Sequence, residues 1–101
     1  MKSTARQNEI RKRLRILVPS ASMDDFIAME KIAMAGHLRH LPPSISAWQA
    51  VTTRARHAYT DYDQLLDDGY DVESARHFVL DDINGKLGEW GCAEQISEHE
   101  E

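Results

Sequence analysis

The sequence predicts an all-α fold, a compact single domain of about four helices. Apolar residues recur at spacings of three and four along most of the chain, which is the period of an amphipathic helix. No segment of the sequence shows the sustained apolar–polar alternation that is typical of a half-buried strand. A length of 101 residues suffices for one hydrophobic core and not for two.

The first helix is predicted to begin at Ser3 or Thr4, either of which can cap it. It is expected to end near Leu17, because Pro19 cannot continue a helix. Its apolar face consists of Ile10, Leu14 and Leu17.

The second helix is expected to begin after Ser22, with Asp25 in the capping-box position, and to end at Gly36. Apolar side chains cover almost its whole circumference: Met23, Phe26, Ile27, Met29, Ile32, Ala33 and Met34. A helix with so little polar surface belongs in the centre of a core or against another subunit. Residues 36–45 then form a connection, because the Pro42–Pro43 pair prevents a helix from running through it.

The third helix is predicted to be the longest, beginning after Ser44 or Ser46 and ending before Gly69. Apolar residues repeat over five turns: Trp48, Val51, Ala55, Ala58, Tyr59, Tyr62, Leu65 and Leu66. The fourth helix is expected to run from Asp71 to about Trp90, with Val72, Ala75, Val79, Ile83 and Trp90 on one stripe. The connection between these two helices is so short that we expect an antiparallel hairpin. Residues 1–91 thus form the predicted domain, and the acidic residues 92–101 form a tail that we expect to be flexible.

Charge is distributed unevenly along the chain. The whole sequence has a net charge of −5, but residues 1–18 carry six basic side chains against one acidic side chain, a local charge of +5. The basic first helix therefore either docks on the acidic body or reaches for an external polyanion. We favour docking, because the remaining residues carry a charge of −10 and repel nucleic acid. In the nucleic-acid alternative, the contacts would come from Arg11, Lys12 and Arg15, whereas Arg13 lies near the apolar edge and could pair internally.

Several functional classes are disfavoured by the residues present. Cys92 is the only cysteine, so an intramolecular disulfide is excluded and a reducing, cytoplasmic setting is expected. The longest apolar run near the start spans residues 16–18, far too short for a signal peptide or a membrane span. No nucleophile elbow, phosphate-binding loop or dinucleotide fingerprint is present, so we expect no cofactor and no catalytic residue.

Two His-x-x-x-Asp pairs could in principle contribute to a metal site. They are His57 with Asp61 and His77 with Asp81, each pair placed on one helical face. Counting 100° per residue, both pairs point away from the apolar stripes through which the two helices would meet. We therefore expect no metal site within one subunit.

Residues 54–76 combine several uncommon residues at fixed spacing. The pattern consists of Arg56, His57, Thr60, Asp61, Tyr62, Asp63, Leu65, Leu66, Gly69, Ala75 and Arg76. It resembles the domain of unknown function 2293 family, and the likeness extends from about Ile10 to Trp90. The sequence departs from the family pattern at residues 36–43, where the family is rich in glycine and arginine. The resemblance implies a helical domain and no particular activity.

Arg76 falls within the apolar stripe of the fourth helix and therefore needs an acceptor. Asp63 is the expected partner across the hairpin, with the Tyr62 hydroxyl as a second acceptor. The alternative is an anion pocket in which Arg56 and Arg76 hold a phosphate or a carboxylate. The candidate residues for this clasp or pocket are Arg56, His57, Asp61, Tyr62, Asp63 and Arg76.

The leading functional hypothesis is a non-enzymatic protein-interaction module that self-associates. It rests on the apolar second helix with its methionines and on two tryptophans in a small chain. A protein partner or a homodimer is expected, and no membrane. The alternatives are nucleic-acid binding through the first helix and, with less weight, small-anion binding at Arg56 and Arg76.

Overall fold

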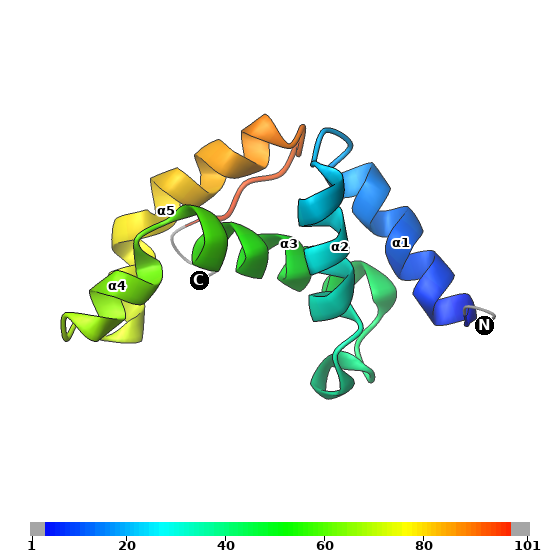
Figure 1. Cartoon of the computed structure of the whole chain (residues 1–101), viewed down its shortest axis with the longest axis horizontal. Coiled ribbons are helices and arrows are strands. Elements are labelled where there is room, and N and C mark those ends of the chain that lie inside the picture. The colour runs from blue at the N-terminus through cyan, green and yellow to red at the C-terminus, as the bar shows by residue number, and fades with distance from the viewer. Residues whose placement is uncertain (1–3, 98–101) are drawn as a thin grey trace.

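The structure is a computed structural model that describes residues 4–97 (Figure 1). Over this range it contains the helices α1 (Ala5–Leu17), α2 (Met23–Ala33), α3 (Pro43–Tyr59), α4 (Tyr62–Asp67) and α5 (Val72–Glu89), and a short 3-10 helix, Gly36–Leu38. No strand occurs within residues 4–97. The predicted all-α class is therefore confirmed, but with five α-helices in place of four.

The starts of three helices follow from their capping residues. Thr4 accepts a hydrogen bond from the Gln7 amide at 3.0 Å, and the Gln7 side chain accepts one from the Thr4 amide at 2.9 Å. Ser22 caps α2 and Asp71 caps α5 through their side-chain oxygens. α3 begins earlier than predicted, because Pro43 occupies its first turn, where a missing amide hydrogen is tolerated.

The predicted long helix from Ser44 to Gly69 is wrong, because the chain leaves helical geometry at Thr60, with φ −136° and ψ 171°. The Thr60 hydroxyl donates to the Arg56 carbonyl and accepts a hydrogen bond from the Tyr62 amide. A hydroxyl that bonds to nearby backbone in this way competes with the helical pattern. The break separates α3 from α4, so the expected hairpin of two consecutive helices becomes a three-helix segment.

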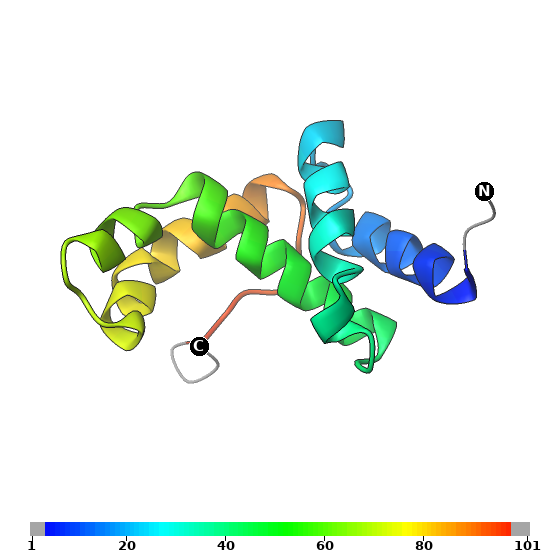
Figure 2. The same ribbon diagram turned by 60° about the horizontal axis from the view of Figure 1, so that its bottom comes forward.

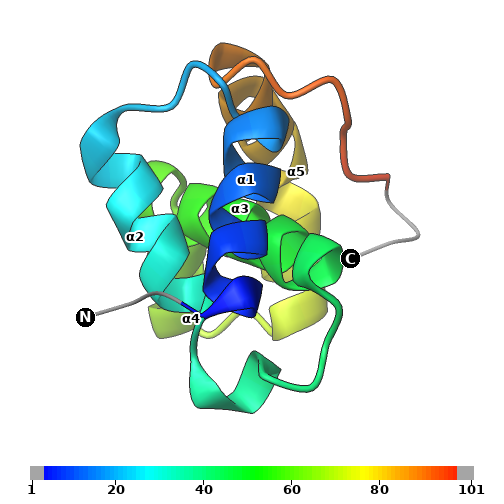
Figure 3. The ribbon, with the colours of Figure 1, turned by 90° about the vertical axis from the view of Figure 1, so that its right-hand side faces the viewer.

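α3 is the central helix, and the prediction that the second helix is central is wrong. α3 packs against α1 and α2 towards one end and against α4 and α5 towards the other (Figure 2). Viewed from the α1 side, α3 lies behind α1, with α2 beside them (Figure 3). Small side chains at Ala47, Ala50 and Ala55 are fully buried, which allows neighbouring helices to approach α3 closely.

α2 uses only part of its apolar surface within the chain. Phe26, Met29 and Ala33 are buried, whereas Met23 is 63% exposed and Ile27 is 45% exposed. None of the helices in the described part of the chain is both long enough and apolar enough to cross a membrane.

The segment after α5 is not helical, yet it is attached to the body. Ser20 donates its amide hydrogen to the Trp90 carbonyl at 2.9 Å. Gly91 has φ +81°, and an added Cβ would lie 3.1 Å from Ser20 Oγ, so glycine suits this position. Ile96 is buried and belongs to the hydrophobic core. Residues 98–101 of the predicted flexible tail lie outside the described residues.

Candidate functional site

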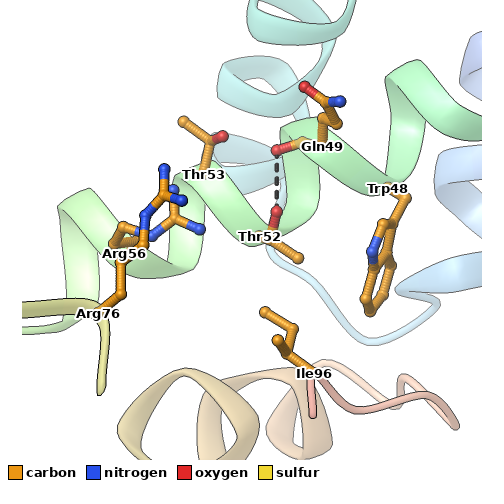
Figure 4. Close-up of a pocket in the computed structure, with 7 residues that line it drawn as sticks. All are labelled: Trp48, Gln49, Thr52, Thr53, Arg56, Arg76 and Ile96. Carbon is orange, nitrogen blue, oxygen red and sulfur yellow. Dashed lines mark hydrogen bonds between the residues drawn. The ribbon is translucent and has the colours of Figure 1, made fainter. Parts of the chain in front are cut away.

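A cavity of about 320 Å³ opens along one side of α3 (Figure 4). Seven of the described residues line this cavity, which we call the arginine pocket: Trp48, Gln49, Thr52, Thr53, Arg56, Arg76 and Ile96. The first five come from α3, Arg76 comes from α5, and Ile96 comes from the segment after α5. The pocket therefore depends on three parts of the chain that are distant in sequence.

The spacing of the α3 residues explains why they share one surface. Gln49, Thr52, Thr53 and Arg56 follow one another at intervals of three, one and three residues, which places them along one helical face. The Thr52 hydroxyl donates to the Gln49 carbonyl at 3.2 Å. Trp48 lies at one end of the pocket and the two arginines lie at the other, with Ile96 on the opposite wall from α3 (Figure 4).

The two arginines are held in a partly desolvated setting. The Nε atoms of Arg56 and Arg76 are both buried. The Arg56 guanidinium carbon lies 5.5 Å from the centre of the Tyr62 ring, a cation–π arrangement with a side chain that is itself 5% exposed. Because the local dielectric is lower than in water, these positive charges attract an anion more strongly than exposed arginines would.

The Asp63–Arg76 clasp is not formed. Asp63 Oδ1 lies 2.7 Å from His57 Nδ1, and both side chains are about half exposed. The break at Thr60 accounts for this difference, because it places Asp63 in the first turn of α4 rather than on a continuation of α3. Tyr62 is not positioned as a hydroxyl acceptor in the described contacts; its ring packs against His57 and Arg56.

The predicted pairing of His57 with Asp61 on one helical face also fails, because α3 ends at Tyr59. Asp61 is exposed at the start of α4, and its side chain makes no capping hydrogen bond. On α5, His77 and Asp81 are both exposed. Within residues 4–97, no three His, Cys, Asp or Glu side chains are grouped so that they could hold a metal ion.

A model of the family described as "Uncharacterized conserved protein (DUF2293)" matches residues 27–91, well over half of the chain. The chain belongs to the DUF2293 family. The match begins within α2, later than the expected start near Ile10, and it includes α3, α4 and α5. Six of the seven residues of the arginine pocket lie inside the matched range. The comparisons with curated proteins and with solved structures gave no match.

Sequence reasoning missed a second polar cluster of this DUF2293 chain, which joins α2 to α3. Asp25 is 3% exposed, and its carboxylate accepts hydrogen bonds from the Tyr59 hydroxyl at 2.8 Å and from Arg54 Nε at 2.9 Å. The Ser22 hydroxyl also donates to it, at 3.2 Å. We call these four residues the Asp25 cluster. The signal in the sequence is an aspartate next to Phe26 on an apolar helix, and the capping-box position of Asp25 accounts for that aspartate without a distant partner.

The Asp25 cluster changes the proton affinity of its members. Burial raises the pKa of the Asp25 carboxyl, but the hydrogen bonds from Tyr59, Arg54 and Ser22 together outweigh burial and hold that pKa below its ordinary value of 3.8. The hydrogen bond to Asp25, with burial, raises the pKa of the Tyr59 hydroxyl above 10.0. Asp25 therefore stays ionised at neutral pH and fixes Arg54 as a structural cation.

The basic helix α1 precedes the matched DUF2293 range and is docked on the body at two points. Arg6 donates hydrogen bonds to the Leu38 carbonyl, the Leu41 carbonyl and Ser46 Oγ. Arg11 Nε lies 3.1 Å from Glu30 Oε2 of α2. Arg11, which the nucleic-acid alternative names as a contact residue, is therefore partly covered, because α2 packs against that side of α1.

The remaining basic residues of α1 are more accessible. Arg13 Nε lies 3.1 Å from Glu9 Oε1 of the same helix. Arg13 therefore has a partner within its own chain, which is one of the arrangements that its position near the apolar edge allows. The Arg15 guanidinium carbon lies 4.7 Å from the centre of the Phe26 ring, although the residue is exposed. Lys12 is exposed as well. The contacts of α1 therefore favour docking over presentation of a continuous basic surface.

Proposed function

We propose that this domain is a non-enzymatic binding module that recognises an anionic group of a protein partner in the arginine pocket. The observation that carries the proposal is the convergence of Arg56 and Arg76, from two helices, on one cavity. A guanidinium presents a planar fork of donors that matches a carboxylate or a phosphate. The hydroxyls of Thr52 and Thr53 supply neutral hydrogen-bonding groups at the same surface.

The composition of the pocket supports binding rather than catalysis. Among residues 4–97, the side chains that line it include no carboxylate, histidine or thiol. The described part of the pocket wall therefore offers no general base or nucleophile of these common types. A cytoplasmic location, in keeping with a single cysteine, belongs to the same proposal.

The course of the helices is part of the proposal. Arg56 lies near the end of α3, and Arg76 lies near the start of α5. An antiparallel arrangement of α3 and α5, linked through α4, brings these two positions to the same end of the domain. The short connection would then hold the two guanidinium groups at a fixed separation before any ligand binds.

The test is a titration followed by the amide resonances of the residues that line the pocket. One series uses inorganic phosphate and the other uses citrate, so that the two anion chemistries are compared directly. Saturable shifts are expected, and the Arg56→Gln/Arg76→Gln variant should bind at least about tenfold more weakly, a loss of about 1.4 kcal/mol. Arg39→Gln removes an exposed charge elsewhere and is the matched control. Equal affinity in the double variant and the control would overturn the proposal.

Self-association is a second candidate function, favoured by the exposed apolar side chains around α2. Met23 is 63% exposed and Ile27, four positions later on the same helical face, is 45% exposed. Exposed apolar side chains that adjoin one another on a surface are typical of contact with another protein. Sedimentation velocity at increasing concentration should show a dimer that Ile27→Glu weakens; a monomer at every concentration would exclude it.

A further inference from the structure

A hollow of about 180 Å³ lies where the end of α1 meets the start of α2, and we call it the α1–α2 hollow. The described residues that line it are Arg15, Val18, Pro19, Ala21, Met23 and Phe26. Val18 and Phe26 are buried members of the hydrophobic core, whereas Met23 is 63% exposed. The hollow therefore offers an apolar seat for a large side chain that comes from outside the chain.

The surface around the hollow is positively charged. The Arg15 guanidinium carbon lies 4.7 Å from the centre of the Phe26 ring, which holds this cation at the wall of the hollow. Along residues 10–34, the exposed charged side chains are four cations and one carboxylate: Lys12, Arg13, Arg15, Lys31 and Asp24. A partner that fills the hollow should therefore be apolar at its centre and negatively charged around it.

An apolar group of this kind is exposed at the other end of the molecule, where α4 meets α5 (Figure 1). Tyr70 is 45% exposed and Phe78 is 61% exposed. Their rings pack edge to face, with centres 5.5 Å apart, and we call them the aromatic pair. Because each ring supports the other, the pair is already ordered before it meets a partner, which lowers the entropic cost of binding.

The aromatic pair lies in the most acidic part of the described chain. Residues 61–82 carry eight exposed carboxylates and one arginine, a net charge of −7 with histidine counted as neutral. Asp81 and Asp82 follow Phe78 by three and four positions, so they adjoin it on one face of α5. The surface of the aromatic pair is therefore complementary to the α1–α2 hollow in charge as well as in shape.

We propose that copies of this chain associate head to tail, with the aromatic pair of one copy seated in the α1–α2 hollow of the next. The inference rests on self-association, the second candidate function, and it names the two surfaces that meet. Met23 and Phe78 are both exposed, so the two surfaces do not cover each other within one chain. In the contact, the aromatic rings meet Met23 and the Arg15 guanidinium, and Asp81 and Asp82 face the cations of α1 and α2.

The contact has two consequences for assembly. The two surfaces differ, so the association is heterologous, and the first contact leaves one surface of each kind available for a further copy. A small contact centred on two rings is typical of a weak, transient interface. Association should therefore increase with protein concentration and decrease with salt.

The test uses two variants, each of which has lost one of the two surfaces. Phe78→Glu removes the aromatic pair and Met23→Glu alters the hollow, and both positions are exposed, so the fold should be kept. In sedimentation velocity, each variant alone should be a monomer at concentrations at which the unchanged chain associates. An equimolar mixture should form a complex of two chains that does not grow further, because each variant keeps the surface that the other has lost. Ile45→Glu, at an exposed apolar position outside both surfaces, is the matched control and should associate like the unchanged chain.

Amide resonances then identify the surfaces that meet in the mixture. When only the Met23→Glu variant is isotope-labelled, addition of the unlabelled Phe78→Glu variant should shift resonances around Tyr70 and Phe78. When the labels are exchanged, the shifts should appear at residues 15–27. Shifts in any other region would overturn the proposed contact.

The charges of the contact have a test of their own. Arg15→Glu should weaken the association about tenfold, because it places a carboxylate against the acidic surface of the aromatic pair. Adding Asp81→Arg and Asp82→Arg to the same chain should restore the association. An association that Arg15→Glu leaves unchanged would overturn the charge pairing on which the inference depends.

The remaining outcomes separate this inference from the function on which it rests. A mixture that stays monomeric while the unchanged chain associates would overturn the head-to-tail contact and leave self-association standing. The same conclusion would follow if Met23→Glu abolished the association and Phe78→Glu did not, because the contact would then be a symmetric one through α2. A monomer at every concentration of the unchanged chain would overturn self-association as well.

Discussion

Arg54 and Arg56 lie two positions apart on α3 and have opposite surroundings. Two residues turn a helix by about 200°, so the two side chains leave α3 on different sides. Arg54 meets Asp25, a buried carboxylate supplied by α2. Arg56 lines a cavity that it shares with Arg76 of α5. The arginine that joins α2 to α3 has a buried carboxylate as its partner, whereas the arginine that we propose to bind a ligand faces a cavity.

The largest expected effect is a loss of stability when the carboxylate that pairs with Arg54 is removed. Asp25→Ala leaves Arg54 without its carboxylate in a partly buried setting, which should lower the free energy of unfolding by about 3 kcal/mol. Urea denaturation measures the loss. Asp24→Ala, at an exposed neighbouring position, is the control and should cost less than about 1 kcal/mol. An equal effect of the two substitutions would contradict a structural role for the Asp25 cluster.

The second prediction concerns Arg56, the arginine that we propose to bind a ligand. Arg56→Gln should weaken binding of phosphate or citrate about tenfold, about 1.4 kcal/mol, while the free energy of unfolding changes by less than about 1 kcal/mol. Arg54→Gln should show the reverse pattern, a clear loss of stability with anion affinity kept. Titration and urea denaturation of both variants measure the two quantities. If both variants lose stability alike, the distinction between the two arginines fails.

Acid should affect the Asp25 cluster selectively. The pKa of Asp25 is lower in the folded state than its ordinary value of 3.8, so the unfolded chain binds the proton more readily. The stability that Asp25 contributes is therefore present above about pH 4 and is lost as the pH falls through the folded-state pKa. Unfolding of the unchanged chain between pH 5 and 2 should show this decline, and Asp25→Asn should flatten it. A parallel decline in both proteins would place the acid-sensitive group elsewhere.

The smallest effect concerns the first helix, whose arginines resemble Arg54 more than Arg56. Arg11 pairs with Glu30 while both side chains are partly exposed, so the pair should contribute about 0.5 kcal/mol. The variant Arg11→Ala/Lys12→Ala/Arg15→Ala should therefore be slightly less stable. A gel-shift titration at two salt concentrations should show no binding of duplex or single-stranded DNA by either protein. Salt-dependent binding with a slope of about −3 to −4, lost in the variant, would support the nucleic-acid alternative instead.

The features that the sequence predicted well depend on local chemistry. Thr4, Ser22 and Asp71 begin helices because each side chain reaches an amide only three residues away. The break at Thr60 was missed because threonine is acceptable within a helix and the apolar spacing continues across it. The hydrogen bond from the Thr60 hydroxyl to the Arg56 carbonyl does not alter the spacing of apolar residues, so that spacing cannot predict it.

The candidate site could be predicted only in part, because only some of its residues are identified by local sequence spacing. Arg56 and Arg76 could be proposed as a pair because two arginines fall at predictable positions on neighbouring helices. The spacing from Ser22 predicts Asp25 only as a cap, because its contact with Tyr59 joins residues 34 positions apart. Ile96 is a single apolar residue in an acidic segment, and no period identifies such a residue as part of a core. Contacts between distant segments decide these roles, and sequence spacing does not record them.

The hydrogen bond from Ser20 to Trp90 has a consequence for the order of folding. It joins the turn between α1 and α2 to the end of α5, 70 residues later. Closing so long a loop costs chain entropy, and only the packing of the helices against one another offsets that cost. We therefore expect this hydrogen bond to form after the other helices have packed against α3. The Ser20 amide should then exchange its hydrogen with solvent only when the whole domain opens. The exchange rate of the Ser20 amide, near the start of the chain, therefore measures how often the end of α5 detaches from the rest of the domain.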